Sequence, residues 1–310
     1  MKRGLSLLAI CLTICVHIAA GPTEDKQQAP AGAILEIEGT VLLRTSLGAP
    51  AIRLDPKRDL MRSLYLGQAL RVEPGGHVKA AFMSGVRELG PSEEWFTLAL
   101  VTPRTTQQKR VAEALREYGR PGGSRSGSVG TLVSPGNGTV ILAEKSTVRW
   151  RSGSFTGTLS FRLESSSGKV LWKEDGINPN TESLDSATLR ETLSRWRDSE
   201  AAGPLVLTVT GTSGGTAEAA FSVLSKREES KLEADLRAWQ IVGDALLEKI
   251  GRAYECRQRG LRTEEIEELE AALQIAPEST EVLSLLSEAH RRYGDSARAE
   301  TLRNKAELVR

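Results

Sequence analysis

The spacing of apolar residues changes along this chain, and that change limits the folds it can adopt. From Ala33, short runs such as "ILEIEGTVLLR" alternate apolar and polar residues and are separated by glycine, proline and serine, as in antiparallel strands. From Lys226 the apolar residues recur every three or four positions, as on one face of a helix. The 310 residues are long for one domain. We therefore expect a multi-domain chain with β structure first and α-helices last.

The first twenty residues have the pattern of a secretory signal peptide. "MKRGLSLLAICLTICVHIAA" begins with Lys2 and Arg3, continues with an apolar run and ends in small residues, so we predict cleavage after Ala20. The alternatives are an uncleaved membrane anchor and a lipid on Cys15. Residues 21–32 are polar and contain proline, which predicts a tether. An exported protein is expected, with membrane association only through an uncleaved anchor.

Residues 33–102 are predicted to form a small antiparallel β-domain. The stretch "LYLGQALRVEPGGHVKAAFMSGVRELGPSEEWFTL" alternates apolar residues between glycine turns. The order L-x-L-G-x-x-L, a glycine turn, V-K-A-A-F-x-x-G-V and L-G-P resembles the FecR domain, a β-rich module of exported bacterial proteins. Ser84 stands where that family usually has aspartate. The resemblance implies a bacterial protein of the periplasm or cell-envelope surface.

Residues 103–129 are predicted to separate two β regions. "TTQQKRVAEALREY" places Val111, Leu115 and Tyr118 on one face of a helix, and "GRPGGSRSGSVG" has the composition of a flexible linker.

Residues 130–226 predict a second β-domain. Seven or so short strands separated by Gly/Ser turns resemble an immunoglobulin-like or fibronectin-III-like sandwich, with Trp150 as its core tryptophan. The segment "LDSATLRETLSRW" has helical character and is atypical of such a sandwich.

Residues 227–310 resemble a pair of tetratricopeptide (TPR) repeats. In "LQIAPESTEVLSLLSEAHRRYGDSARAE", Pro277 separates the two units and Gly294 ends the first helix of the second unit. Large and small residues recur at the positions of that family: Leu247, Ile250, Gly251 and Tyr254 in the first unit, and Leu283, Leu286, Ser287 and His290 in the second. The preceding helix, Glu228–Gln240, is expected to pack on the first repeat.

The TPR resemblance implies a groove that binds a protein partner. The residues proposed to contact that partner are Tyr254, Leu283, Leu286 and His290. The balanced charge, 41 basic and 40 acidic residues, argues against nucleic acid as a partner.

No arrangement in the sequence predicts catalysis, a metal or a cofactor. His77 and His290 fall in different domains without a ligand at metal-binding spacing. "GTSGG", Gly211–Gly215, matches the G-x-S-x-G nucleophile motif but lies between two strand patterns, which indicates a hairpin turn. The pairs Glu264-Glu265 and Glu267-Glu268 are typical of a solvated helix face.

The sequence also predicts which cysteine and tryptophan side chains are buried. Cys256 is the only cysteine after the signal peptide and is expected to be a small core or boundary residue, with an intermolecular disulfide as the alternative. Trp150 and Trp172 are expected in a core, whereas Trp95 is a candidate for exposure.

The favoured function is a non-enzymatic scaffold or protein-interaction protein of the periplasm or cell envelope. The alternatives are a FecR-type envelope sensor or regulatory partner, and a cell-wall or polysaccharide binder.

Overall fold

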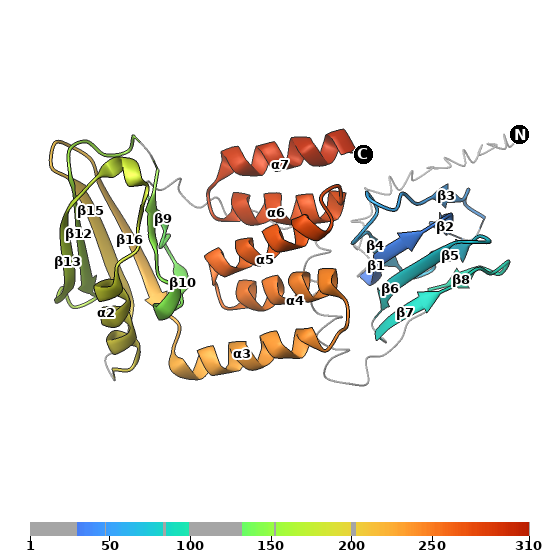
Figure 1. Cartoon of the computed structure of the whole chain (residues 1–310), viewed down its shortest axis with the longest axis horizontal. Helices are drawn as coiled ribbons and strands as arrows, with labels where there is room; N and C mark the ends of the chain where they lie inside the picture. Colours follow the sequence, from blue (N-terminus) through green and yellow to red (C-terminus); the bar gives the residue numbers. More distant parts are fainter. Residues whose placement is uncertain are drawn as a thin grey trace, which may run out of the picture.

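A computed structural model describes residues 30–46, 48–82, 85–98, 132–151, 153–199 and 203–309. Strands dominate the chain up to residue 223, and five helices in succession, α3 to α7, follow them. The predicted order of β structure first and helices last is confirmed. In space the order differs, because the helices lie between the two β regions (Figure 1). We name these parts the N-terminal β region (30–98), the middle β region (132–224) and the helical stack (226–309).

Several predictions lie outside the described residues. They are the signal peptide and its cleavage at Ala20, most of the tether, Ser84, and the helix and linker of residues 103–129. No helix among the described residues is long and apolar enough to span a bilayer.

The N-terminal β region contains two four-stranded antiparallel sheets, in the orders β4-β1-β6-β7 and β3-β2-β5-β8. The strands are β1 (Pro30–Glu38), β2 (Val41–Arg44), β3 (Ile52–Arg53), β4 (Ser63–Tyr65), β5 (Ala69–Val72), β6 (His77–Phe82), β7 (Gly85–Leu89) and β8 (Phe96–Thr97). β1 begins inside the segment predicted as a tether. At Gly39, with φ +66°, a Cβ would lie 2.8 Å from the Cα of Gly76, so the turn between β1 and β2 requires glycine.

β1 is buried on both of its faces. Ile34 and Ile37 point into the core between the two sheets of its own region. Ala33 and Leu35 belong to the apolar cluster that also contains the helices. This strand therefore serves two cores, which explains why it shows a nearly continuous apolar run at its start.

The middle β region is a two-sheet arrangement of eight strands. One sheet has the order β14-β11-β9 and the other β10-β16-β15-β12-β13. The strands are β9 (Leu132–Ser134), β10 (Thr139–Ile141), β11 (Val148–Trp150), β12 (Leu159–Ser165), β13 (Val170–Ile177), β14 (Ser183–Leu184), β15 (Leu205–Gly211) and β16 (Thr216–Val223). β10 runs parallel to β16, and the other pairs are antiparallel.

Aromatic side chains fill the core of the middle β region. Phe161 lies between Trp150 and Trp172, with ring centroids 5.4 and 6.4 Å away. The predicted core role of both tryptophans is confirmed, since they are 3% and 7% exposed. The atypical helical segment is α2 (Ala187–Arg197), which Ser186 caps and which adds Leu189 and Leu193 to this core.

The helical stack consists of α3 (Lys226–Gln240), α4 (Ala245–Gln258), α5 (Arg262–Ile275), α6 (Thr280–Arg292) and α7 (Ser296–Val309). α4 pairs with α5, and α6 pairs with α7. α3 packs on α4 as expected: Gly251 faces the indole of Trp239, and a Cβ there would lie 2.2 Å from the ring. Asp244 and Ser279 cap α4 and α6, and Gly294 turns the chain at φ +82°.

Candidate functional site

The four residues predicted to bind a partner lie in the packed interior of the helical stack. Leu283 and Leu286 are fully buried, His290 is 8% exposed, and Tyr254 is partly buried against the same apolar cluster. The structure brings them into one core, where they hold helices together. Their role in partner binding stays a prediction.

His290 is an unusual member of that core. Neither of its ring nitrogens makes a hydrogen bond within the described structure. Nδ1 lies 3.3 Å from the Asp295 carboxylate, but the contact lacks hydrogen-bond geometry. Burial lowers the pKa of His290, and the Asp295 charge opposes that shift only in part. We therefore treat the imidazole as neutral.

An open groove of about 510 Å³ runs between α6 and α7. Small residues lie along it, and the Ser287 hydroxyl donates to the carbonyl of Ala299 at 2.7 Å. The rim carries both charges: Glu288 pairs with Arg291 at 2.6 Å, and Glu300 lies 3.9 Å from Arg303. The lining residues are Ser284, Ser287, Glu288, Arg291, Ser296, Ala299, Glu300, Arg303, Ala306 and Glu307. This groove, unlike the four predicted residues, is accessible to a partner.

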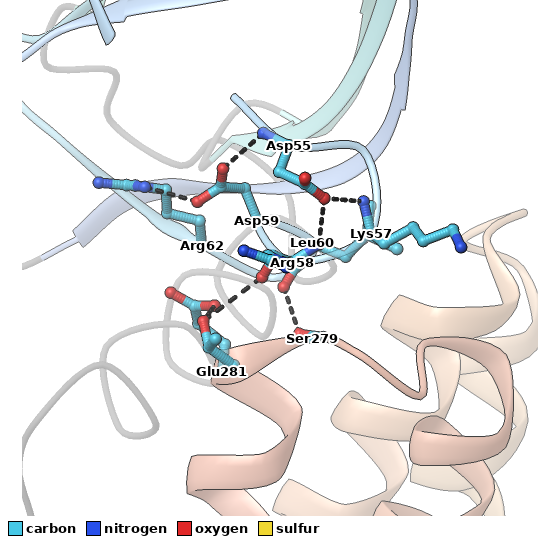
Figure 2. Close-up of polar contacts among 9 residues, drawn as sticks. Asp55, Lys57, Arg58, Asp59, Leu60, Arg62, Ser279 and Glu281 are labelled. Atoms are coloured by element: carbon cyan, nitrogen blue, oxygen red, sulfur yellow. Dashed lines mark hydrogen bonds and ion pairs between the residues drawn. The ribbon is translucent and has the colours of Figure 1, made fainter. Parts of the chain in front are cut away.

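The helical stack joins the N-terminal β region through polar contacts at the start of α6 (Figure 2). Ser279 caps α6 by accepting from the Val282 amide at 3.2 Å, and its hydroxyl donates to the carbonyl of Leu60. The Thr280 amide donates to the carbonyl of Arg58 at 3.2 Å. The first turn of α6 is therefore bonded to a loop more than two hundred residues earlier in the sequence.

That loop, residues 55–62, is held in shape by its own aspartates (Figure 2). The Asp55 carboxylate accepts from the amides of Lys57 and Arg58 at 2.9 and 3.0 Å. The amides of Arg58 and Lys57 lower the pKa of Asp55. Asp59 accepts from the Asp55 amide at 2.7 Å. The loop thus presents two fixed carbonyl groups to the helix.

An apolar contact continues this N-terminal junction. Leu35, Met61 and Ala81 belong to the same buried cluster as Leu246 and Ile250 of α4. The cluster also contains residues of α5, α6 and α7. The N-terminal β region therefore shares one hydrophobic core with the helical stack.

The middle β region meets the side of the helical stack opposite the N-terminal β region (Figure 1). The Val140 amide of β10 donates to the carbonyl of Gly260 at 3.1 Å. A small apolar cluster surrounds this contact, with Leu224, Leu232, Cys256 and Leu261 as its buried members. Beside it, Arg197 of α2 pairs with Glu229 of α3 at 2.7 Å. The buried Cys256 confirms its predicted core role, and burial raises the pKa of its thiol.

The prediction of a solvated glutamate face on α5 was wrong for two residues. Glu264 is 9% exposed, and Glu265 is fully buried. Glu265 accepts two hydrogen bonds from Arg292, at 2.9 and 3.2 Å, and one from the Tyr293 hydroxyl. The start of α5 is covered by the middle β region on one side and by the end of α6 on the other. Its carboxylates are therefore removed from water.

The other residues with possible chemical roles have structural positions. Gly211–Gly215 spans the turn between β15 and β16, which confirms the predicted hairpin. Trp95 is partly buried, with the guanidinium carbons of Arg44 and Arg71 4.0 and 5.1 Å from its ring centroid. His77 begins β6 and lies 3.8 Å from Glu88. Within the described ranges, His, Cys, Asp and Glu form no group of three that is arranged to hold a metal ion.

No protein-family model matches the chain, and no curated protein matches it.

Proposed function

We propose that this chain is a non-catalytic scaffold of the bacterial cell envelope that binds a protein partner. In this proposal the N-terminal β region is FecR-like, the middle β region is immunoglobulin-like, and the helical stack contains two TPR-like repeats. Export to the periplasm or the envelope surface follows from the signal-peptide pattern of residues 1–20. Neither a cofactor nor nucleic acid is part of the proposal.

The order of strands supports the immunoglobulin-like assignment of the middle β region. β9 pairs with β11, whereas the next strand, β10, joins the other sheet and pairs in parallel with the last strand, β16. β12, β15 and β16 are neighbours in that second sheet. Immunoglobulin-like sandwiches place their third, sixth and seventh strands together in the same way. α2 replaces the connection that precedes the sixth of those strands.

Two features of the helical stack support the TPR-like assignment. α4 with α5 and α6 with α7 form successive helix pairs, each turned by a glycine in the left-handed conformation, Gly260 and Gly294. The small residues Gly251, Ala299 and Ala306 lie where helices pack closely. Repeat proteins use this geometry to present binding surfaces.

The groove between α6 and α7 is the observation that carries the proposed function. The β regions flank the helical stack on two sides, at the ends of its helices (Figure 1), whereas this groove has an open volume of about 510 Å³. Serine, glutamate and arginine side chains line it and offer donors and acceptors of both charges. A segment of a protein partner that carries both polar and apolar groups matches that lining.

Site-specific photo-crosslinking tests this function. A crosslinking amino acid at Arg303, which lies in the groove with a 64% exposed side chain, is compared with one at Lys173, which lies on β13 and is 58% exposed. We expect a discrete adduct with an envelope protein from position 303 alone. Ser284→Arg, which fills the groove from an exposed position on α6, should abolish that adduct. Equal adducts from both positions, or an adduct that survives Ser284→Arg, would contradict the proposal.

A polysaccharide-binding role has weaker support. Trp150, Trp172 and Trp239 are buried, and Trp95 is covered by two arginines. Trp196 is partly buried, and its indole donates to the carbonyl of Gly203. The described tryptophans therefore form no exposed platform for a sugar ring.

A further inference from the structure

A second cavity lies between the middle β region and the helical stack. Its volume is about 110 Å³, well above the roughly 10–15 Å³ that holds one water molecule. β9, the turn before β10, and β16 form one wall. The start of α5 and the turn between α6 and α7 form the other.

Two arginines that line this cavity lack an ionic partner. The side chain of Arg262, at the start of α5, makes no hydrogen bond or ion pair with any described residue. Its guanidinium carbon lies 5.1 Å from the ring centroid of Tyr293. From the opposite wall, the guanidinium of Arg151 makes one long hydrogen bond, 3.4 Å, to the carbonyl of Gly294. Both charges therefore enter the cavity without a carboxylate in contact.

The acidic residues nearby are committed to other groups. Glu265 neutralises Arg292. Asp295 accepts from the Arg298 amide at the start of α7 and faces His290. Glu218 also lines the cavity, but its carboxylate accepts from the Thr208 hydroxyl at 3.4 Å. Glu218 and Asp295 balance the formal charge of Arg151 and Arg262 in the lining, but neither carboxylate forms an ion pair with either arginine.

The space beside the Arg262 guanidinium depends on a glycine. Gly136 lies beside it, and a Cβ at that position would be 3.0 Å from Nη1 of Arg262. Burial lowers the pKa of Arg262, and the Arg151 charge acts in the same direction, whereas Tyr293 and Asp295 oppose it. A partly desolvated cation without an ion pair gains stability when an anion joins it.

We propose that this cavity binds a small oxyanion, a phosphate or a carboxylate group, between Arg151 and Arg262. Guanidinium groups match both oxyanions because their parallel N–H donors form paired hydrogen bonds. Arg151 belongs to the middle β region and Arg262 to the helical stack, so a bound anion links the two. Binding therefore stabilises this junction by mass action. The inference does not depend on the proposed partner groove.

The test uses the full chain and two probes, inorganic phosphate and acetate, in calorimetric titrations at matched low ionic strength. We expect saturable binding of one anion per chain. Arg262→Gln and Arg151→Gln should each weaken it at least tenfold. Arg298→Gln removes an exposed arginine of α7 outside the cavity and should leave the affinity unchanged. Tighter binding of phosphate or of acetate identifies which oxyanion the site prefers, and either result supports it.

Thermal unfolding separates loss of the site from loss of the fold. Without the anion, Arg262→Gln should melt no lower than the wild type, because the substitution removes an unpaired cation. With phosphate or acetate, whichever binds, the wild type should melt higher while Arg262→Gln stays unchanged. No saturable binding of either probe by the wild type would overturn the inference. Equal anion binding by Arg262→Gln and Arg298→Gln would overturn it as well.

Discussion

The two β regions meet the same helical stack in different ways. At the N-terminal junction, Leu35 and Met61 join the apolar cluster of the helices, so two parts of the chain share one core. At the middle junction, the middle β region keeps its own aromatic core. A separate small cluster, a few hydrogen bonds and a charged cavity make the connection there.

This difference predicts how each junction responds to its surroundings. Apolar burial carries no charge that pH can change or salt can screen, whereas arginines without an ion pair and buried carboxylates depend on both. We infer that the N-terminal junction is a permanent connection and that the middle junction is the adjustable one.

The largest expected effect comes from breaking the shared core. Met61 is 5% exposed and reaches the helical cluster from the N-terminal β region. Met61→Ala should reduce the free energy of unfolding by about 2–4 kcal/mol, because it removes buried apolar atoms and leaves a cavity. Urea unfolding measures the change.

An exposed position in the same β region provides the control for Met61→Ala. Ile52 of β3 is 43% exposed, so Ile52→Ala should change the unfolding free energy by less than about 0.5 kcal/mol. Equal changes in the unfolding free energy would mean that Met61 adds no stability through the apolar cluster of the helical stack.

The middle junction has its own reporter, Cys256. In a chain with Cys11 and Cys15 replaced by serine, the rate of thiol labelling measures how often the small cluster around Cys256 opens. Leu261→Ala removes a fully buried member of that cluster, should cost about 2–3 kcal/mol, and should accelerate labelling. Met61→Ala should leave labelling under native conditions unchanged. Acceleration by both variants would show that the two junctions open together.

A comparison of two serine caps isolates the polar part of the N-terminal junction. Ser279 is fully buried, caps α6 and donates to Leu60. Ser225 is exposed and caps α3, accepting from the Glu228 amide. Ser225→Ala should cost about 1 kcal/mol for the lost cap. Ser279→Ala should cost about 2 kcal/mol, since the carbonyl of Leu60 also loses its donor. Equal costs in urea unfolding would show that the hydrogen bond from Ser279 to Leu60 does not contribute to stability.

Local signals in the sequence predicted the elements closely. The helix expected at Glu228–Gln240 is found at Lys226–Gln240. Gly294, predicted to end the first helix of the second unit, follows α6 in the left-handed conformation. These features depend on neighbours within a few residues, so one stretch of sequence contains the information.

Contacts between distant segments were not predictable in the same way. Glu265 looked solvated because its partner, Arg292, is 27 residues away in sequence. The repeat pattern also selected Leu283 and Leu286, but that pattern marks residues that pack between helices, so it selects buried positions. The accessible groove lies between α6 and α7, where Ser287 is itself a repeat position but the charged lining residues carry no distinctive spacing.

The smallest expected effect concerns pH and again compares the junctions. Burial raises the pKa of Glu264 at the middle junction and of Glu281 at the N-terminal junction above the ordinary value of 4.5. Nearby cations oppose the shift: Lys145 at Glu264 and Arg62 at Glu281, where a hydrogen bond from Thr280 opposes it more strongly.

Above pH 4.5 the folded state holds these protons more tightly than the unfolded state, so stability falls as pH rises through the raised pKa values. Glu264→Gln removes that penalty. The variant should be more stable than the wild type at neutral pH, and the difference should vanish below pH 4.5. Glu281→Gln should gain less, because the Thr280 hydroxyl already stabilises the charged form. Glu267→Gln, at an exposed position on α5, is the control for Glu264→Gln. Thermal unfolding at both pH values measures the effect, and a lower melting temperature of Glu264→Gln at neutral pH would show that its carboxylate stabilises the middle junction instead.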